Sequence, residues 1–331
     1  NTMADAGSKA VVMEVSSHAL ALNRADAAAF DAAVFTNLQR DHLDFHKDLE
    51  SYFEAKLRLF QLLADSPKKR PIAVVNADED KAAAILAVLD PRVTAVTYGI
   101  DKPADFRAEK IEILHDRTVF ELSAPGTRRT VTLKLLGRYN IYNALAAIAA
   151  AVSTGVPLET AVRGAETLAN VPGRLERVEL GQPFSVFVDY AHTDAALENV
   201  LSNLAKMPHK KIITVFGCGG DRDRTKRAPM AKAAAAMSDY VIVTSDNPRG
   251  ENPVQIFADI VAGLKGESVN YVVMPDRKTA IREAVDVAQP GDIVLIAGKG
   301  HEDYQIFKDR TLHFDDRETA AEAIKTKPKI D

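Results

Sequence analysis

Four consecutive residues, Asp246, Asn247, Pro248 and Arg249, form the stretch of the chain that carries the most chemical information. They follow an apolar run at 240–244 that predicts a buried strand, so we expect them at its carboxyl end, where doubly wound sheets bind ligands. A carboxylate and an amide oxygen can accept hydrogen bonds from an ammonium group, and a guanidinium can bind a carboxylate through two parallel hydrogen bonds. The stretch can therefore hold an amino acid, although a type I turn also explains it.

Two polar clusters in the first half of the chain could hold a metal ion beside a phosphate. Glu14 lies near the end of an apolar run at 10–15, and the polar stretch 37–44, which includes His42, follows a second apolar run at 33–36. If both runs are parallel strands, their carboxyl ends meet at one edge of the sheet. A carboxylate and an imidazole there could share a divalent cation with phosphate oxygens and water. Taken singly, each residue is equally well explained as a cap or turn residue, but together they favour a metal–nucleotide site.

Lys56 interrupts an apolar helical face. The other members of that face, at helical spacing, are Leu49, Tyr52, Phe53, Leu57, Phe60 and Leu63. A lysine that turns inward loses solvation, which makes its neutral amine accessible to chemistry. Spacing alone favours the other interpretation, in which the stem lies along the apolar surface and the ammonium reaches solvent.

Composition narrows the class of protein. The chain has 331 residues, enough for two domains, and its net charge of −4 gives no support for nucleic-acid binding. The single cysteine, Cys218, rules out an internal disulfide and fits a reducing cytosol. We find no apolar run long enough to span a membrane and no signal peptide, so we expect a cytoplasmic α/β protein. Because the chain begins at Asn1 rather than Met, we expect a piece that lacks its natural N-terminus.

Alternating apolar runs and helical segments predict a mainly parallel sheet covered by helices. Runs that predict strands lie at 10–15, 33–36, 72–76 and 93–98. Segments that predict a small antiparallel ribbon lie at 111–114, 118–122 and 130–135. We expect helices at 140–153 and 158–168.

A second α/β unit follows. Pro172 and Gly173 end a helix, and β-rich sequence comes next, so we divide the chain into domains at 1–171 and 172–331. Strands are then expected near residues 184, 212, 241, 271 and 293. This renewed alternation predicts a Rossmann-like C-terminal domain.

A set of motifs in a characteristic order resembles the Mur ligase family, and in particular the members that add meso-2,6-diaminopimelate during peptidoglycan synthesis. The motifs are Met-Glu-Val-Ser-Ser-His at 13–18, Asn-Leu-Gln-Arg-Asp-His-Leu-Asp at 37–44, Gly-Arg-Tyr-Asn-Ile-Tyr-Asn at 137–143, Pro-Gly-Arg at 172–174, Asp-Tyr-Ala-His-Thr at 189–193, Gly-Cys-Gly-Gly-Asp-Arg-Asp at 217–223, Asp-Asn-Pro-Arg at 246–249 and Gly-Lys-Gly-His-Glu at 298–302. The stretch 52–60 resembles the family segment whose lysine is carbamylated. The resemblance covers nearly the whole chain and implies a central ATPase domain followed by an amino-acid-binding domain.

The resemblance also implies roles for individual residues. Those implied to bind UDP-N-acetylmuramoyl-L-alanyl-D-glutamate are Asn1, Thr2, Ser16 and Arg24. Those implied to organise Mg²⁺, and with it the catalysis, are Glu14, His42 and carbamylated Lys56. Those implied to lie near ATP are Asn140, Arg174, Asp189 and His192. Those implied to hold meso-2,6-diaminopimelate are Arg222, Asp246, Asn247, Pro248, Arg249, Gly298 and Glu302. A solvated charged loop would explain Arg222 without the motif.

The implied reaction is ATP-driven amide ligation, in which a carboxylate is phosphorylated to an acyl phosphate and an amine then displaces the phosphate. Closure of the two domains would bring amine and acyl phosphate together. The chain has no Gly-x-x-x-x-Gly-Lys-Ser/Thr phosphate loop, which in the family lies upstream of the position of Asn1. We therefore expect the isolated chain to be inactive as an ATPase. Met3 and Leu22 also depart from the family pattern, which puts the muropeptide contacts in doubt.

Two alternatives stay open. The chain could belong to a relative with another amino-acid substrate, such as a lysine-adding ligase or folylpolyglutamate synthase. Arg249 argues against both, because it needs a distal carboxylate that lysine lacks. The chain could also be a non-catalytic amino-acid-binding module. In each case we expect a monomer that binds neither nucleic acid nor a membrane.

Overall fold

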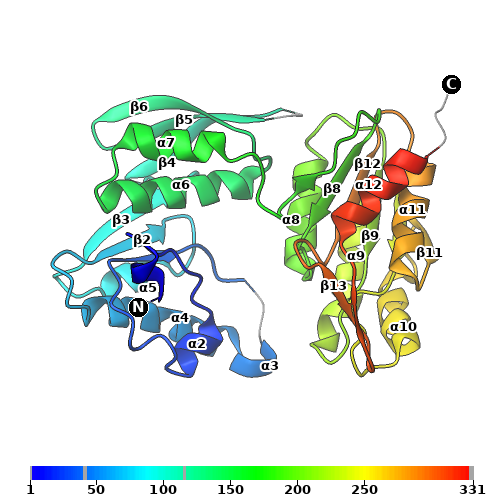
Figure 1. Ribbon diagram of the computed structural model, residues 1–331, viewed down its shortest axis with the longest axis horizontal. Helices are drawn as coiled ribbons and strands as arrows, with labels where there is room; N and C mark the ends of the chain where they lie inside the picture. The colour runs from blue at the N-terminus through cyan, green and yellow to red at the C-terminus, as the bar shows by residue number, and fades with distance from the viewer. Residues whose placement is uncertain (1, 40–42, 115–116, 328–331) are drawn as a thin grey trace.

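The computed structural model describes residues 2–39, 43–114 and 117–327. Its architecture is α/β, with two six-stranded sheets, each covered by helices, and one two-stranded hairpin. The first sheet and its helices form the N-terminal half of the molecule, and the second sheet, its helices and the hairpin form the C-terminal half (Figure 1). Among the described residues no helix combines the length and apolarity that a membrane span requires.

The first sheet has its strands in sequence order. They are β1 (Ala32–Phe35), β2 (Ile72–Asn76), β3 (Thr94–Gly99), β4 (Phe106–Ile113), β5 (Thr118–Ala124) and β6 (Thr127–Leu133). Strands β1 to β4 pair in parallel, whereas β4, β5 and β6 pair antiparallel. The predicted antiparallel ribbon is therefore confirmed, but it starts earlier than expected and continues the parallel sheet through β4.

Helices cover both faces of the first sheet. The helices of this half are α1 (Thr2–Asp5), α2 (Ser17–Ala21), α3 (Leu43–His46), α4 (Leu49–Ala64), α5 (Ala82–Ala87), α6 (Arg138–Ser153) and α7 (Leu158–Thr167). One apolar core joins the sheet to α6 and α7, and another joins it to α4 and α5. In α4 the Asp48 carboxylate caps the first turn by accepting a hydrogen bond from Ser51 N at 2.8 Å. Phe53, Phe60 and Leu63 of this helix are buried, which confirms the predicted apolar face.

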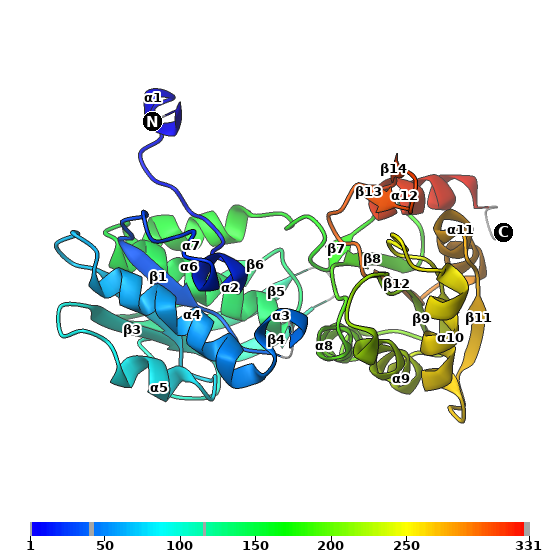
Figure 2. The same cartoon turned by 90° about the horizontal axis from the view of Figure 1, so that it is seen from below.

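The predicted strand at 10–15 is wrong. This segment has no regular secondary structure, and Val12 is fully exposed, with Val11 and Met13 more than half exposed. Figure 2 shows the reason: α1 and the extended segment behind it stand away from the sheet, so the segment has no neighbouring strand to pair with. Apolarity predicted the strand, but a strand also needs a partner for its backbone hydrogen bonds.

The second sheet is doubly wound. Its strands are β7 (Glu176–Arg177), β8 (Ser185–Asp189), β9 (Ile212–Phe216), β10 (Tyr240–Val243), β11 (Asn270–Val273) and β12 (Ile293–Ala297). They lie in the order β11-β10-β9-β12-β8-β7, and every pair except β7–β8 is parallel. The hairpin consists of β13 (Tyr304–Ile306) and β14 (Thr311–His313). The carboxyl ends of β8, β9, β10 and β12 therefore meet at one edge, as predicted for the motif-bearing loops.

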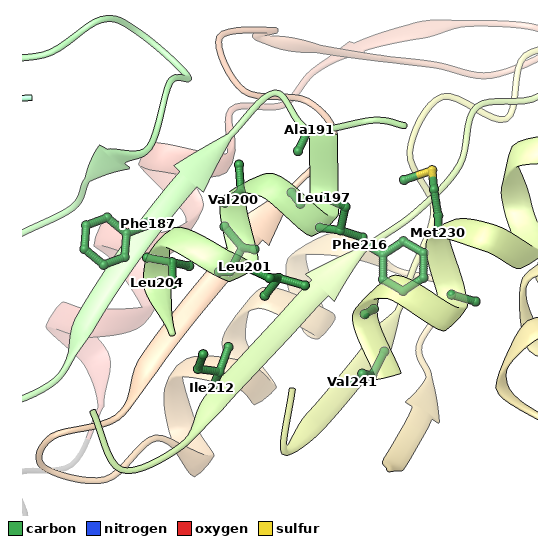
Figure 3. Packing of buried hydrophobic residues seen from close by; sticks show 14 of the residues in the cluster. Phe187, Ala191, Leu197, Val200, Leu201, Leu204, Ile212, Phe216, Met230 and Val241 are labelled. Carbon is green, nitrogen blue, oxygen red and sulfur yellow. The ribbon is translucent and has the colours of Figure 1, made fainter. Parts of the chain in front are cut away.

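The helices of the C-terminal half are α8 (Asp194–Leu204), the 3₁₀ turn η1 (Arg224–Lys226), α9 (Arg227–Met237), α10 (Pro253–Leu264), α11 (Arg277–Val287) and α12 (Asp316–Thr326). Helices α8, α9 and α10 pack on one face of the sheet, and α11 and α12 on the other. Figure 3 shows Leu197, Leu201 and Leu204 of α8 among the side chains of the first of these cores, together with Ile212 and Phe216 of β9. Because both faces are covered, the central strands are continuously apolar rather than alternating.

The two halves touch at the start of α6. Arg138 N donates a hydrogen bond to Asn203 Oδ1 of α8 at 3.1 Å. Leu136, just before α6, belongs to the apolar core of the C-terminal half, and Tyr139 packs against that core. Two sheets with separate cores agree with two domains, while the boundary between residues 171 and 172 stays a prediction.

Candidate functional site

Three loops at the carboxyl edge of the second sheet pack against one another without space for side chains at two glycines. A Cβ at Gly217, after β9, would lie 2.2 Å from the carbonyl oxygen of Thr244, after β10. A Cβ at Gly220 would lie 1.9 Å from the carbonyl oxygen of Pro248. Glycine is therefore required at both positions, and the loop after β9 lies directly on the Asp-Asn-Pro-Arg loop.

Asn247 lies at the centre of the polar contacts in this region. Its Oδ1 accepts hydrogen bonds from Lys299 Nζ at 3.1 Å and from Ile306 N at 3.0 Å, and its Nδ2 donates to Glu302 Oε2 at 2.9 Å. Both lone pairs of the amide oxygen are thus used inside the protein. This differs from the expectation that the amide accepts from a ligand ammonium: Asn247 instead holds the loops after β10 and β12 together.

Lys299 is a member of this cluster that the sequence interpretation missed. It is fully buried, and its Nζ lies 3.2 Å from Glu302 Oε2 and 3.6 Å from Asp246 Oδ1. Asp246 and Glu302, predicted to bind the amino acid, are therefore close to one buried cation. A lysine between two glycines directly after a buried strand was the available signal, because a charged residue in such a position has little chance to reach solvent.

The two predicted arginines are placed differently. Arg249 is half-buried and has a left-handed backbone with φ +53°. Its N donates to Ile306 O at 3.0 Å, and its Nη1 donates to Gly220 O at 3.0 Å, so the guanidinium lies between the loops. Arg222 is exposed and donates from Nη1 to Asp221 O at 3.1 Å. The guanidinium of Arg249 thus contacts the loop after β9, near Tyr304, and the charges of Asp246 and Glu302 act on the same phenol. Arg222 is left on the surface of the adjacent loop.

A second buried cation, Arg227 at the start of α9, ties the loop after β9 to the loop after β10. Its Nη2 donates to Glu251 Oε2 at 2.7 Å and to Gly219 O at 3.2 Å, and its Nη1 donates to Asp259 Oδ2 at 2.8 Å. The hydrogen bonds from Arg227 lower the pKa of Glu251 to about 2. Glu251 also accepts a hydrogen bond from Asp221 N at 3.2 Å. This bond fixes the position of the residue that precedes Arg222.

A third buried cation, Arg277 at the start of α11, joins the ends of β10 and β12. It forms a bidentate pair with Asp316 of α12, with Nε–Oδ1 and Nη2–Oδ2 distances of 2.8 and 2.7 Å, and both side chains are fully buried. The same guanidinium donates to Ser245 O at 3.3 Å and to Ala297 O at 3.0 Å. These carbonyls directly precede Asp246 and Gly298, so Arg277 supports both loops without lying among the predicted ligand contacts.

Three of the four predicted nucleotide contacts gather at the end of β8. Asp189 is buried and accepts hydrogen bonds from Leu175 N at 2.6 Å and Ala191 N at 2.8 Å, and burial raises its pKa. The Tyr190 ring has the Arg174 guanidinium 5.4 Å from its centroid, and the His192 ring is 4.6 Å from it.

The fourth predicted contact, Asn140, is buried in the first turn of α6. Its Nδ2 donates to Leu136 O at 2.8 Å, and its Oδ1 accepts from Asn143 Nδ2 at 3.2 Å. Since α6 begins where the two halves touch, Asn140 lies at the junction predicted for the nucleotide. Its role there stays a prediction.

The nucleotide side and the amino-acid side meet in backbone contact. A Cβ at Gly173, which has φ +68°, would lie 2.2 Å from the backbone N of His301. A Cβ at Gly300 would lie 2.6 Å from Tyr190 Cβ, and Tyr190 N donates to Gly173 O at 2.8 Å. Gly298 N also donates to Asp189 O at 3.0 Å. The segment that joins the halves therefore lies directly under the loop that carries Glu302.

The residues predicted to bind the muropeptide are not gathered with this region. Ser16 is the N-cap of α2, where its Oγ accepts a hydrogen bond from Ala19 N at 3.2 Å. Arg24 is exposed, and Thr2 begins α1, which stands away from the sheet (Figure 2). Asn1 lies outside the described residues. Their roles stay predictions.

The predicted metal ligands do not form a site within the described residues. Glu14 is exposed in the segment that forms no strand, and His42 lies outside the described residues. Lys56 is half-buried on α4, with Nζ 5.0 Å from the Tyr52 ring centroid. In the described ranges no group of three or more His, Cys, Asp or Glu side chains could hold a metal ion. Magnesium binding and carbamylation of Lys56 stay predictions.

Comparisons with known proteins give the family. The Mur ligase middle domain matches residues 1–151, and the Mur ligase glutamate ligase domain matches residues 173–300. A relative from Geobacter sulfurreducens is 46% identical over 341 residues, which cover 98% of this chain and 67% of the relative. The chain belongs to the Mur ligase family.

Several similar proteins share the name UDP-N-acetylmuramoyl-L-alanyl-D-glutamate–2,6-diaminopimelate ligase. The relative from Solibacter usitatus is 49% identical over 320 residues, covering 97% of this Mur ligase chain and 64% of the relative. A solved structure of that name has 38% identity and a TM-score of 0.61, and the match covers 94% of this chain and 63% of that one. The chain thus spans somewhat less than two thirds of these proteins. A pseudomurein peptide ligase from Methanothermus fervidus, at 20% identity and TM-score 0.69, shares the fold.

Proposed function

We propose that the chain is part of an ATP-dependent ligase that joins meso-2,6-diaminopimelate to UDP-N-acetylmuramoyl-L-alanyl-D-glutamate in peptidoglycan synthesis. Similar proteins that carry this activity in their names support the proposal. The observation that carries the amino-acid part is the proximity of Asp246, Glu302 and Arg249 at the carboxyl edge of the second sheet, where the charges of all three act on the Tyr304 phenol. Carboxylates and a guanidinium within one small region suit a ligand that bears ammonium and carboxylate groups together.

The proposed reaction has two steps. A carboxylate oxygen of the dipeptide attacks the γ-phosphorus of ATP, which forms an acyl phosphate and releases ADP. The neutral amine of diaminopimelate then attacks the acyl carbon, loses a proton, and expels inorganic phosphate as the amide forms. Asp246, Glu302 and Arg249 would hold the amino acid during this second step, and Arg222 would contact it from the solvent-exposed side of the adjacent loop.

The nucleotide would lie at the junction of the halves. Arg174, near the Tyr190 ring, would face a phosphate, and Asn140, Asp189 and His192 would surround the nucleotide. Magnesium, when bound, would neutralise phosphate charge. The described residues do not gather a site for it, so its assignment to Glu14, His42 and carbamylated Lys56 rests on the family resemblance alone. We also expect a monomer that acts in the cytoplasm, apart from membranes and nucleic acids.

Titration calorimetry of the chain with meso-diaminopimelate and with L-lysine tests the amino-acid assignment. We expect diaminopimelate to bind at least about tenfold more tightly, because Arg249 can bind its second carboxylate through charged hydrogen bonds worth about 1.5–3 kcal/mol. Arg249→Met should remove that preference, whereas Arg282→Met, which removes an exposed arginine of α11, should keep it. Tighter binding of lysine would favour a lysine-adding relative.

A second measurement separates a ligase from a non-catalytic binding module. ADP release is followed with ATP, magnesium and the UDP-muramoyl dipeptide, with and without diaminopimelate, in a protein that contains this chain together with an upstream phosphate loop. We expect ADP release to depend on the amino acid. Binding of diaminopimelate without any ADP release would favour the binding module.

A further inference from the structure

We propose that Lys299 determines amino-acid specificity by balancing the charge of the pocket formed by Asp246, Arg249 and Glu302, so that the pocket accepts an amino-acid end with both an ammonium and a carboxylate rather than a lone ammonium. The inference rests on the proposed function, since it concerns the same amino-acid site. The proposal makes Lys299 a residue that determines which amino acid binds.

Lys299 is placed as an internal counter-ion. Its side chain is fully buried, and its Nζ has Asn247 Oδ1 at 3.1 Å, Glu302 Oε2 at 3.2 Å and Asp246 Oδ1 at 3.6 Å. The Tyr304 ring centroid lies 5.5 Å away on the hairpin. An ammonium enclosed in this way cannot move to solvent without breaking all these contacts, so Lys299 stays beside both carboxylates.

The pocket contains two negative and two positive side chains. Asp246 and Glu302 supply the negative charges, and Lys299, which lies beside both, supplies one positive charge. Arg249 supplies the other, since its charge acts on the Tyr304 phenol together with those of Glu302 and Asp246. Asp246 Oδ1 is buried, lies 3.6 Å from Lys299 Nζ, and accepts no hydrogen bond from any described residue, so its hydrogen-bonding capacity is not used within the fold.

Nearby ionisable groups do not change this balance. The charge of Arg277 is matched by its bidentate partner Asp316, to which it is bound within the fold. Tyr190 and Tyr304 face the same carboxylates and stay neutral, because burial and then the negative charge of Glu302 raise the pKa of both phenols. Asp303 and Arg174 also act on these tyrosines, but both are exposed, as is Arg222 on the neighbouring loop, so solvent screens their charges.

A neutral pocket and a charged one select different ligands. An amino-acid end that carries an ammonium and a carboxylate is neutral, so its binding leaves no net charge among the buried groups. A lone ammonium adds one uncompensated positive charge, which is unfavourable where water is excluded. Without Lys299 the pocket would carry a net negative charge, and a lone ammonium would then be the ligand that balances it.

A simple structural role for Lys299 makes a different prediction. If the lysine only holds the loops after β10 and β12 together, its loss should weaken binding of every amino acid by a similar factor. Charge balance instead requires the ratio of two dissociation constants to change. The useful ligands are therefore meso-diaminopimelate, whose two ends are both zwitterionic, and L-lysine, whose side chain ends in a lone ammonium.

The experiment is calorimetric titration of both ligands into the wild-type chain, Lys299→Met and Lys308→Met. Methionine keeps most of the length of lysine and removes its charge, and Lys308 is an exposed lysine beyond β13 that provides the same loss of charge outside the pocket. We expect Lys299→Met to lower the preference for diaminopimelate over lysine at least about tenfold, and Lys308→Met to keep it. An unchanged preference in folded Lys299→Met overturns the inference.

Glu302→Gln provides an independent test that does not depend on folding of Lys299→Met. It gives the pocket a net positive charge, so lysine should lose more affinity than diaminopimelate and the preference should rise about fivefold or more. The double variant Lys299→Met with Glu302→Gln has a neutral pocket again and should return toward the wild-type preference. A fall in preference for Glu302→Gln contradicts charge balance. If the wild-type chain binds neither ligand, the proposed function itself fails. If the wild-type chain binds diaminopimelate but the variants keep the same preference, only the role of Lys299 fails.

Discussion

The two predicted binding regions of this chain differ in how their side chains are held. At the carboxyl edge of the second sheet, the buried cations Arg227, Arg277 and Lys299 join the loops through hydrogen bonds to carboxylates and carbonyls. In the N-terminal half, the segment with Glu14 and Ser16 is largely exposed, forms no strand, and contains only the one-turn helix α2. The amino-acid region is thus preorganised within the described structure, whereas the muropeptide and metal residues are not brought together.

This difference indicates how much each region contributes to the free energy of unfolding. A buried ion pair with complete hydrogen bonding is costly to break, so loops tied in this way keep one geometry before a ligand arrives. An exposed segment whose apolar side chains meet water contributes little to the folded state. Substitutions in the two regions should therefore have very different effects on unfolding. Four comparisons, each with its own control or matched variant, test this in decreasing order of effect.

Arg277→Met should have the largest effect. It removes one partner of a fully buried ion pair and leaves Asp316 as an uncompensated buried charge, so we expect a loss of about 3–5 kcal/mol in the free energy of unfolding of the C-terminal half. Urea unfolding followed by circular dichroism measures this, with hydrogen exchange in β9 and β12 to assign the transition. Arg282→Met on the same helix is exposed and should change the free energy by less than about 0.5 kcal/mol. Equal losses of unfolding free energy in the two variants would show that the ion pair between Arg277 and Asp316 does not stabilise the C-terminal half.

Glu251→Gln should have the next largest effect and a distinct dependence on pH. Hydrogen bonds from Arg227 lower the pKa of Glu251 from 4.5 to about 2, so its stabilisation is complete above pH 4.5 and is lost as the pH falls toward 2. A shift of this size corresponds to at most about 3 kcal/mol. We expect the variant to be less stable at pH 7 and to lose less further stability than the wild type on acidification, measured by urea midpoints from pH 7 to 3. Glu267→Gln, at an exposed position, should follow the wild-type curve.

Gly220→Ala and Gly164→Ala form a matched pair across the two halves. A Cβ at Gly220 would lie 1.9 Å from Pro248 O, so the loops must separate, and we expect a cost of about 1–3 kcal/mol together with weaker diaminopimelate binding. Gly164 lies within α7 with no atom within 4 Å of such a Cβ, so alanine there should stabilise the N-terminal half by about 0.5–1 kcal/mol. Thermal unfolding of both variants shows whether each substitution raises or lowers the unfolding temperature. A lower unfolding temperature for Gly164→Ala would show that the space beside α7 is filled.

Val12→Ser should have the smallest effect. The side chain is fully exposed, so replacing it changes no buried area, and we expect a change of less than about 0.5 kcal/mol in the free energy of unfolding. Val215→Ser in β9, where the side chain is completely buried, is the contrasting control and should be strongly destabilising. A large loss for Val12→Ser would mean that residues 10–15 are packed in solution, and the contrast between the two regions would then be wrong.

Sequence patterns predicted the five parallel strands of the second sheet well because these are largely apolar runs between helices, whereas the short edge strand β7, Glu176–Arg177, has no apolar residue and was missed. The same criterion was wrong for residues 10–15, since apolarity says nothing about whether a pairing strand is present. The loop residues Asp246 and Arg249 could be found because the motif is local. The contacts of Lys299 and Arg277 could not, because they join residues 52 and 39 positions apart and depend on how the loops fold over one another.

The backbone contact between Gly173 and His301 has a thermodynamic consequence. Gly173 lies in the segment that joins the halves, beside Arg174, and His301 lies in the loop that carries Glu302, with no space for a side chain between them. A nucleotide that repositions Gly173 must therefore also displace the amino-acid loop. Linkage makes such coupling reciprocal: if bound nucleotide raises the affinity for the amino acid by some factor, the amino acid raises the affinity for the nucleotide by the same factor. One backbone contact, between Gly173 and His301, would then make the two ligands cooperative although they share no contact.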